Sequence, residues 1–460
     1  MSGQYNRKEA FKIAVVAAIG GLLFGFDTGV ISGALLLIKE QWHLGTLAQE
    51  VVTSAVLVGA ILGALFSGRV ADRYGRKRVI IATAIIFAIG SVATALSPNA
   101  PILIAGRIVL GIAIGVASFT VPLYISEVSP SQIRGSLVSL NQLMITIGIV
   151  VSYLVNFSLA TVDQGWRYMF AFGLIPSILL FVGMLFLPGS PRWLMSVGRE
   201  EEAKASLELV YSEESAKKEL EGIRQAIHSD LEKERVSYKE LLSPYVRPVL
   251  LIGVGIMFFQ QATGINTVIY YSPTILQMAG FGTPKDAMLV ALPIGIVNVL
   301  ATILSIYLID RIGRKALLYI GVTGMVLSLF VLGLVFGMDN ASGSETMKYL
   351  AVGSLIFYIA SFGISLGPVA WLLISEIFPV RVRNLGMSVA TLSNWFFNLI
   401  VALTFLSIVD LIGATGTFWL YATVGLATLW FIYRYIPETK GKTLEEIEGH
   451  FATGKLARDL

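Results

Sequence analysis

The 460-residue sequence contains no cysteine, only three histidines and few charged residues, 14% of the total. The absence of cysteine excludes a disulfide-built secreted protein and a metal site held by thiolates. The charged fraction is far below the roughly 25% of a soluble domain, which disfavours a soluble enzyme. Apolar residues instead make up 55% of the chain and the mean hydropathy is +0.76, so a disordered chain is excluded as well.

The apolar residues occur in long blocks, and a helix that crosses a bilayer needs about 20 such residues. The blocks cover residues 13–37, 51–71, 79–97, 101–123, 137–158, 167–187, 249–272, 288–309, 316–337, 349–375, 386–407 and 412–436. Each block predicts a transmembrane helix. The predicted fold class is therefore an all-α membrane protein with twelve transmembrane helices, and its partner is the lipid bilayer and not a nucleic acid.

Basic residues in the short connections orient the chain. One side holds Arg7, Lys8, Lys12, Arg69, Arg73, Arg76, Lys77, Arg78, Arg134, Arg311, Arg314, Lys315, Arg381 and Arg383, and the other holds Lys39, Arg167, Lys285 and Lys348. Cytoplasmic loops carry the excess of Lys and Arg, which makes the first side cytoplasmic. We therefore predict a multi-pass membrane protein with both termini in the cytoplasm.

One connection, residues 188–248, is long and charged and contains no apolar block. Glu213 precedes Lys217 by four residues, a spacing that supports an exposed helix. We read this segment as short cytoplasmic helices that join two halves. The predicted domains are an N-terminal six-helix bundle (1–187), a cytoplasmic helical linker (188–248), a C-terminal six-helix bundle (249–437) and a cytoplasmic tail (438–460).

The two halves repeat each other in sequence. Asp72-Arg73-Tyr74-Gly75-Arg76-Lys77 recurs as Asp310-Arg311-Ile312-Gly313-Arg314-Lys315, and the spacing from Ser126-Glu127 to Pro130 and Arg134 recurs from Ser375-Glu376 to Pro379 and Arg383. Pro188 and Pro437 close the sixth and twelfth blocks. Six spans separate each pair, so both copies have the same orientation. A parallel pseudo-repeat of this kind is expected where two bundles rock about a shared site at the midplane.

The charges of these repeated loops predict a conformational role. Ion pairs that form on the cytoplasmic face in only one state stabilise that state. The alternative is that these charges only fix the orientation of the chain in the membrane. The predicted gating residues are Asp72, Arg73, Arg76, Glu127, Arg134, Asp310, Arg311, Arg314, Glu376 and Arg383.

Two ionisable residues lie well inside predicted spans, Asp27 in the first and Arg107 in the fourth. An intramembrane charge costs at least about 2.5–3.5 kcal/mol, so we expect the two to pair. A carboxylate whose distance from a guanidinium changes between conformations also changes its proton affinity. Asp27 is the predicted proton carrier because Arg107 does not deprotonate. The alternative is a purely structural pair.

Neutral polar side chains gather in the second half. Gln260, Gln261 and Asn266 lie in the seventh span, and Asn394 lies in the eleventh. Amides both donate and accept hydrogen bonds, as sugar hydroxyls require, although amides also join membrane helices. Trp371 and Phe362 offer aromatic faces, and Gly264, Gly367 and Pro368 are candidate helix breaks. We predict a neutral, hydroxylated ligand.

The motifs together resemble the sugar porter family of the major facilitator superfamily, in particular bacterial proton-coupled monosaccharide symporters. The similarity runs over nearly the whole chain and rests on Gly68-x-x-x-Asp72-Arg73-x-Gly75-Arg76-Lys77, Gly106-Arg107, Gln260-Gln261-x-x-Gly264-Ile265-Asn266, Tyr270-Tyr271, Gly367-Pro368-x-x-Trp371 and Pro437-Glu438-Thr439-Lys440-Gly441. The resemblance implies two six-helix bundles, alternating access and a monosaccharide at the midplane. The implied sugar-binding residues are Phe24, Gln142, Gln260, Gln261, Asn266, Tyr271, Phe362, Gly367, Trp371, Asn394 and Trp395.

The resemblance further implies import of a neutral monosaccharide, a hexose or pentose such as glucose or xylose, with a proton. Asp27 matches the carboxylate of the family's symporters, whereas passive members usually carry a neutral residue there. A passive sugar uniporter of the same fold is the alternative. Gly189 departs from the family, which usually has Glu at this position. The resemblance also implies a monomer in the cell inner membrane of a bacterium. We expect no enzymatic activity, no cofactor other than the coupling proton and no metal.

Overall fold

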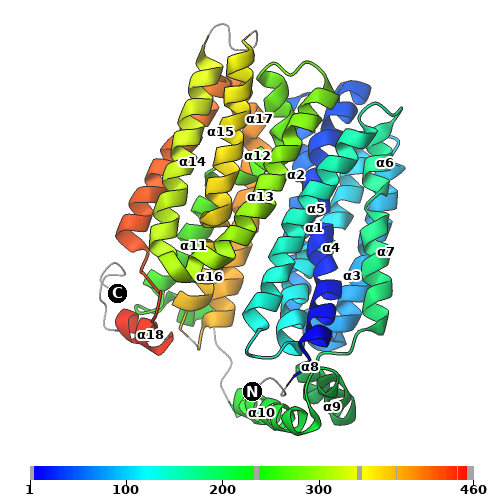
Figure 1. The fold of residues 1–460 in the computed structure, drawn as a ribbon, viewed down its shortest axis with the longest axis vertical. Helices are drawn as coiled ribbons and strands as arrows, with labels where there is room; N and C mark the ends of the chain where they lie inside the picture. Colours follow the sequence, from blue (N-terminus) through cyan, green and yellow to red (C-terminus); the bar gives the residue numbers. More distant parts are fainter. Residues whose placement is uncertain (1–4, 233–237, 339–343, 380, 443, 453–460) are drawn as a thin grey trace. The chain divides into compact units, whose positions relative to one another are not determined.

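The computed structural model describes residues 5–232, 238–338, 344–379, 381–442 and 444–452. The helices in chain order (Figure 1) are α1 (Arg7–Trp42), α2 (Thr46–Tyr74), α3 (Arg76–Ala95), α4 (Ala100–Val128), α5 (Arg134–Leu159), α6 (Gly165–Ala171), α7 (Leu174–Phe186), α8 (Pro191–Ser196), α9 (Glu200–Glu208), α10 (Glu213–Glu232), the 3-10 helix η1 (Tyr238–Leu242), α11 (Arg247–Ala262), α12 (Ile265–Met278), α13 (Pro284–Ile312), α14 (Arg314–Gly337), α15 (Glu345–Ile364), α16 (Leu366–Ile377), α17 (Arg383–Tyr435) and α18 (Leu444–Ala452).

Every predicted apolar span is largely helical, and the sixth divides into α6 and α7 at residues 172–173. Within the described residues, eleven helical stretches are long and apolar enough to cross a membrane. The last of them, α17, contains the last two predicted spans. Gly413, with φ +74°, kinks α17 between these spans. The eleven stretches therefore supply the twelve predicted crossings.

Two spans are broken where their polar residues lie. The seventh span divides into α11 and α12 at Gly264, as predicted, because its φ of +91° is in the left-handed region that glycine tolerates. The tenth divides into α15 and α16 at Ser365, and the prediction of a break at Gly367 and Pro368 is wrong by two to three residues. Pro368 instead lies in the first turn of α16, where proline disturbs no helical hydrogen bond.

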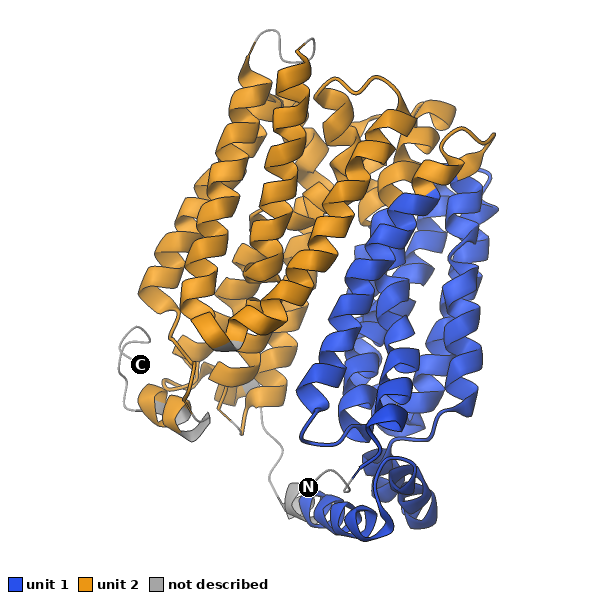
Figure 2. Cartoon of the chain, in the orientation of Figure 1, with its two compact units in different colours: residues 1–30, 55–155, 166–235 blue, residues 31–54, 156–165, 236–460 orange. Residues whose placement is uncertain are grey.

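Two compact units make up the chain (Figure 2). Unit 1 comprises residues 1–30, 55–155 and 166–235, and unit 2 comprises residues 31–54, 156–165 and 236–460. Helices α1, α2 and α5 each continue from one unit into the other. Two short segments of the first half, residues 31–54 and 156–165, therefore group with the second half. The domain boundaries predicted from the sequence remain predictions.

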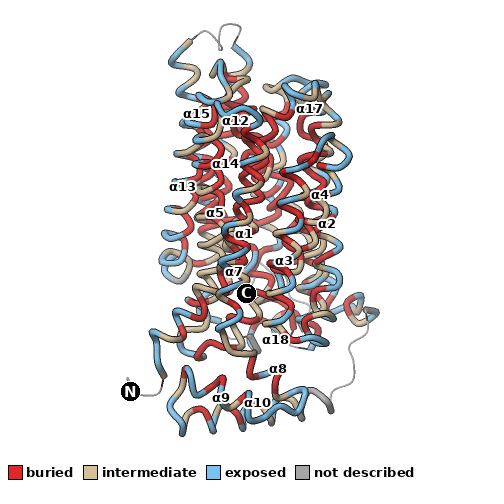
Figure 3. Tube along the Cα trace, turned by 90° about the vertical axis from the view of Figure 1, so that its right-hand side faces the viewer, coloured by how far each residue is buried: buried red, intermediate tan, exposed pale blue. Residues whose placement is uncertain are grey.

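In unit 1 a close approach of α1 and α5 fixes the helix that carries Asp27. A Cβ atom added to Gly25 would lie 1.8 Å from the carbonyl oxygen of Ile145. Glycine is therefore required at this contact, and such small residues let membrane helices pack backbone to backbone. Buried residues follow the helices along much of their length (Figure 3).

Helices α8, α9 and α10 of the charged connection form a small helical layer in unit 1, at the end where the chain begins (Figure 1). Its apolar cluster contains Trp193, Leu194, Ala203, Leu207, Ala216 and Leu220. The predicted pair is present, with Lys217 Nζ 2.8 Å from Glu213 Oε1, and the hydrogen bond from Lys217 lowers the pKa of Glu213. The Asn6 backbone N–H donates to the Val210 carbonyl at 2.6 Å, so the residue before α1 is held against this layer.

Candidate functional site

The predicted pair of intramembrane charges is present in unit 1. Arg107 Nη1 donates to both carboxylate oxygens of Asp27, at 3.0 and 3.2 Å. The side chain of Arg107 is 0% exposed and that of Asp27 is 2% exposed. The guanidinium also lies 5.9 Å from the centre of the Phe170 ring, within cation–π range. A charged pair sealed from solvent is strongly coupled, so a change in the charge of either group alters the stability of the contact.

Two predicted sugar-binding residues also lie in unit 1. Phe24 is half-buried on α1, and its carbonyl accepts a hydrogen bond from the Thr28 hydroxyl at 2.8 Å. Phe24 precedes Asp27 by three residues, so the two lie on neighbouring positions of the helix surface. Gln142 is half-buried on α5. The structure therefore places one aromatic and one amide side chain on the two helices that meet at Gly25.

In unit 2 the predicted amides form one continuous hydrogen-bond network. Gln261 donates to Asn394 Oδ1 at 3.1 Å, and Asn394 donates to Gln260 Oε1 at 2.7 Å. Asn266 donates to Gln261 Oε1 at 2.7 Å. The network joins α11, α12 and α17. These amides therefore also hold helices together, which is the other role that the sequence allowed for them. We call Gln260, Gln261, Asn266 and Asn394 the amide cluster.

At the helix breaks, the amide cluster lies beside backbone carbonyls to which it donates hydrogen bonds. Gln260 Nε2 donates to the carbonyls of Leu366 and Gly367 at 2.8 and 3.2 Å. These carbonyls lie directly after the break at Ser365. A Cβ atom added to Gly264 would lie 2.9 Å from the Tyr421 ring, a second reason for glycine at the other break. Irregular backbone at membrane depth is tolerated where protein or a cavity satisfies it, and the Gln260 amide does so here.

The aromatic residues predicted for the sugar site differ in how far they are exposed. Trp371 is exposed on α16, Phe362 is half-buried at the end of α15 and packs against Gly367, and Trp395 is buried beside Asn394. Tyr271 is completely buried and donates to the Ala402 carbonyl at 3.0 Å. Trp371 and Phe362 are accessible enough to contact a ligand, whereas Tyr271 supports the packing of α12 on α17.

The repeated loop of the first half forms an ion-pair network. Arg76 Nε lies 2.9 Å from Glu127 Oε2, and Arg76 Nη1 lies 3.1 Å from Asp72 Oδ1. Ser190 Oγ donates to the same Glu127 carboxylate. Trp193 Nε1 donates to the Asp72 carbonyl at 2.8 Å, which attaches the layer of short helices to the end of α2.

The second half repeats this network with one addition. Arg314 Nη2 lies 2.8 Å from Glu376 Oε1, and Thr439 Oγ1 donates to Glu376 Oε2 at 2.6 Å. Glu438 then accepts the backbone N–H groups of Arg314 and Lys315, each at 3.0 Å, and so caps the start of α14. The matching residue of the first half, 249 positions earlier, is Gly189, which has no carboxylate to cap α3.

The remaining predicted gating residues have separate partners. Arg134 donates to the Ser129 carbonyl at 3.4 Å, and Arg383 donates to the Phe378 carbonyl at 3.2 Å. Arg73 lies 5.4 Å from the Tyr74 ring centre. The Arg311 carbonyl accepts from Lys440 Nζ at 2.6 Å. The side chain of Asp310 lies outside the described part of the structure.

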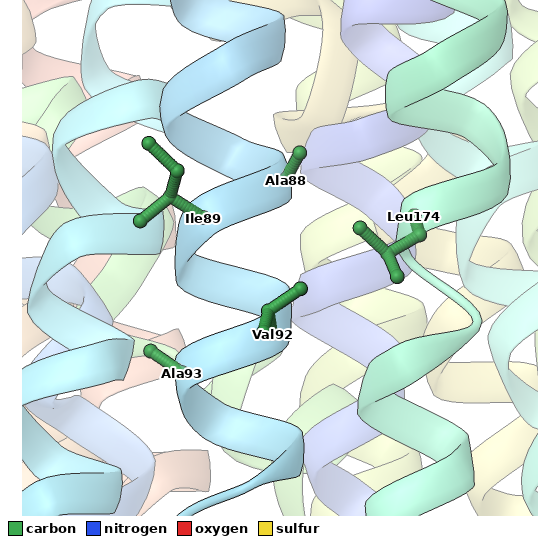
Figure 4. Close-up of a pocket in the computed structure, with 5 residues that line it drawn as sticks. All are labelled: Ala88, Ile89, Val92, Ala93 and Leu174. Carbon is green, nitrogen blue, oxygen red and sulfur yellow. The ribbon is translucent and has the colours of Figure 1, made fainter.

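A hollow of about 420 Å³ in unit 1 is lined by Ala88, Ile89, Val92, Ala93 and Leu174, from α3 and α7 (Figure 4). Its lining is apolar and includes none of the predicted site residues. It offers no hydrogen bonds to a sugar. In the described part of the chain, no group of three or more His, Asp or Glu side chains is placed to hold a metal ion.

The structure contains one buried charge that the sequence-based reading missed. Glu50 is 0% exposed, and it lies in the second turn of α2. The predicted second span began at residue 51, so Glu50 was assigned to a connection, whereas the helix begins at Thr46. The signal available in the sequence was an acidic residue directly adjoining an apolar run.

Comparisons with known proteins agree with this architecture. The sequence profile of the family described as "Sugar (and other) transporter" matches residues 13–451. A D-xylose transporter of Levilactobacillus brevis is 43% identical over 449 residues, covering 96% of each chain. The arabinose-proton symporter of Escherichia coli K12 is 40% identical over 457 residues, covering 99% of this chain and 96% of that protein.

A solved structure shows the same fold. The inward-open conformation of the xylose transporter XylE from E. coli aligns with a TM-score of 0.82 and 33% identity, over 96% of this chain and 99% of that chain. The predicted all-α fold of twelve transmembrane helices is therefore confirmed, and the protein is a multi-pass membrane protein and not an enzyme. The family match over nearly the whole length, together with the paired charges and the amide cluster, shows that the chain belongs to the sugar (and other) transporter family.

Proposed function

We propose that this protein imports a neutral monosaccharide together with a proton by alternating access. Relatives named for D-xylose transport and arabinose–proton symport support a pentose, or a hexose of similar size, as the substrate. The observation that carries the proton coupling is the buried pair of Asp27 and Arg107. The observation that carries the sugar specificity is the amide cluster.

Asp27 is the group that accepts the proton in this proposal. Its only titratable partner among the contacts above is Arg107, which stays protonated at every physiological pH. Protonation of Asp27 removes one charge of the pair and weakens the contact that joins α1 to α4. One proton entering with the membrane potential supplies about 2.3 kcal/mol per 100 mV. That energy is sufficient to accumulate a neutral sugar.

The amide cluster binds the sugar by exchanging partners. In the structure the amides satisfy one another and the Gln260 amide satisfies the carbonyls after Ser365. Sugar hydroxyls donate and accept in the same way, so they replace these contacts without leaving a buried polar group unpaired. Because the cluster joins α11, α12 and α17, an occupied site holds these helices differently from an empty one.

The proposal places the protein in the bacterial inner membrane as a monomer, with both termini in the cytoplasm and no cofactor besides the proton. The distribution of Lys and Arg between the loops supports this orientation. On the cytoplasmic face, the networks around Glu127 and Glu376 are proposed to set the balance between inward-open and outward-open states. Neutralising Glu127, Arg134, Glu376 and Arg383 should then shift distances measured between spin labels on that face.

The test is transport by purified protein in liposomes. Radiolabelled D-xylose, L-arabinose and D-glucose are offered with and without an inside-alkaline pH gradient, and external pH is recorded during uptake. We expect the pH gradient to drive accumulation. Asp27→Asn should retain counterflow exchange of sugar and lose pH-driven accumulation, whereas Asp163→Asn, in an exposed loop, should behave as the parent.

Three results would contradict the proposal. Uphill accumulation that persists in Asp27→Asn would remove Asp27 from the coupling. Equal sugar accumulation by the parent with and without the pH gradient would identify a passive uniporter instead. Counterflow that no monosaccharide supports would overturn the substrate class.

A further inference from the structure

Glu50 is a third buried charge, and it has no role in the proposed coupling. Among the described residues, the charged residues that are buried as whole residues are Asp27, Arg107 and Glu50. Asp27 and Arg107 neutralise each other, whereas no described basic side chain lies within 4 Å of the Glu50 carboxylate. A buried carboxylate without a counter-ion is costly unless strong hydrogen bonds stabilise it.

Those hydrogen bonds come from a helix far away in the sequence. The Ser407 backbone N–H donates to Glu50 Oε1 at 2.7 Å, and Ser407 Oγ donates to Glu50 Oε2 at 2.6 Å. Both oxygens of one carboxylate therefore bind one residue of α17. Hydrogen bonds to a charged group are about twice as strong as those between neutral groups.

A second contact lies one turn away on both helices. Thr46 Oγ1 donates to Asp410 Oδ2 at 2.5 Å. Thr46 is four residues before Glu50, and Asp410 is three residues after Ser407, so the two contacts follow the same pair of helix faces. The start of α2 is thus attached to α17 at two successive levels.

The grouping of the chain agrees with this attachment. Residues 31–54, which include the start of α2, belong to unit 2 with α17, whereas the rest of α2 belongs to unit 1. In the orientation proposed above, the start of α2 is at the extracellular surface. An opening of the transporter to the outside separates these ends and exposes the Glu50 carboxylate to water.

We propose that Glu50 is a positioning residue that latches α2 to α17 through Ser407 when the transporter is closed to the outside, and that opening breaks this latch. The inference rests on the proposed orientation and on alternating access, but not on the identity of the sugar or on proton coupling. Glu50 therefore sets how often the empty protein opens outward.

The experiment uses the absence of native cysteine. Ser54→Cys introduces a single thiol four residues after Glu50, on the same face of α2, at a side chain that is 2% exposed. A membrane-impermeant maleimide is added outside right-side-out vesicles without sugar, and the labelling rate reports outward opening. We expect Glu50→Ala to raise this rate about tenfold or more, because hydrogen bonds to a charged group shift an equilibrium by at least that factor.

Two further variants separate the latch from a loss of folding. Ser407→Ala removes only a hydroxyl from an exposed residue and should raise the rate less than Glu50→Ala does. Glu50→Gln keeps an acceptor for the Ser407 N–H and a partner for its hydroxyl but loses the charge, so its labelling rate should lie between those of the parent and Glu50→Ala. Glu40→Ala, an exposed carboxylate at the end of α1, is the matched control and should change nothing.

The latch is overturned by an unchanged labelling rate in both Glu50→Ala and Ser407→Ala, or by Glu50→Gln labelling as fast as Glu50→Ala. An equal acceleration by Glu40→Ala also overturns it. If Glu50→Ala does not reach the membrane, the rate of Ser407→Ala decides alone. Because no sugar or pH gradient is used, these outcomes are independent of the transport test.

Discussion

Substitution of Arg107 tests how completely the ion pair of Asp27 and Arg107 is shielded from water. Its side chain is 0% exposed and its Nη1 lies 3.0 Å from Asp27 Oδ1. Arg107→Met replaces the guanidinium with an unbranched apolar side chain of similar length, so little space is left behind. The Asp27 carboxylate then lacks its counter-ion in a dry environment. Removal of one partner of a buried pair costs about 3–5 kcal/mol.

The assay is thermal unfolding of the purified variants in detergent, supported by denaturant titration. Arg107→Met should unfold at a clearly lower temperature than the parent. The double variant Asp27→Asn/Arg107→Met carries no charge at this site, so it should recover about half or more of the lost stability. A loss below about 1 kcal/mol, the range of exposed ion pairs, would show that water reaches the pair, and the electrostatic coupling proposed above would fail.

Three further predictions concern stability and sugar binding. Glu438→Gln should lower the free energy of unfolding by about 1 kcal/mol because α14 loses its charged cap. Gly189→Glu should raise the free energy of unfolding by about 0.3–1 kcal/mol by supplying the missing cap to α3. No change in either variant would contradict the assigned contacts. Gly264→Ala should destabilise by at least about 1 kcal/mol, through its φ of +91° and the Tyr421 ring, with the exposed Gly282→Ala as the control. Asn394→Ala should raise the KM for sugar roughly tenfold in counterflow. The substitution removes one of the proposed hydrogen bonds to the sugar and leaves Gln260 and Gln261 without their Asn394 partner. A KM equal to the parent's would refute a ligand role for Asn394.

The two halves show how a duplicated sequence diverges at one contact. Ser190 and Thr439 occupy matching positions, and each donates to the equivalent carboxylate, Glu127 or Glu376. Only the second half retains the carboxylate that caps the following helix. The first half packs Trp193 beside Gly75 instead, where an added Cβ atom would lie 2.9 Å from the indole ring.

The site could be predicted in part. The pairing of Asp27 with Arg107 followed from charge alone, because each is too costly to bury without the other. The amides were identified by residue type, but their order within the network, Asn266 to Gln261 to Asn394 to Gln260, depends on how α11, α12 and α17 pack. In the function proposed above, sugar specificity is a property of the same kind, because it depends on where these amide groups point.

The sequence by itself determined the number of membrane crossings, the duplication and the intramembrane ion pair. These follow from local rules, because apolar length and the cost of a lone charge act wherever the residues stand. Only the tertiary structure decided that the tenth span breaks at Ser365 and that Glu50, at the edge of an apolar run, is buried against Ser407. Such contacts join residues hundreds of positions apart, and their partners are fixed by helix packing and not by any local pattern.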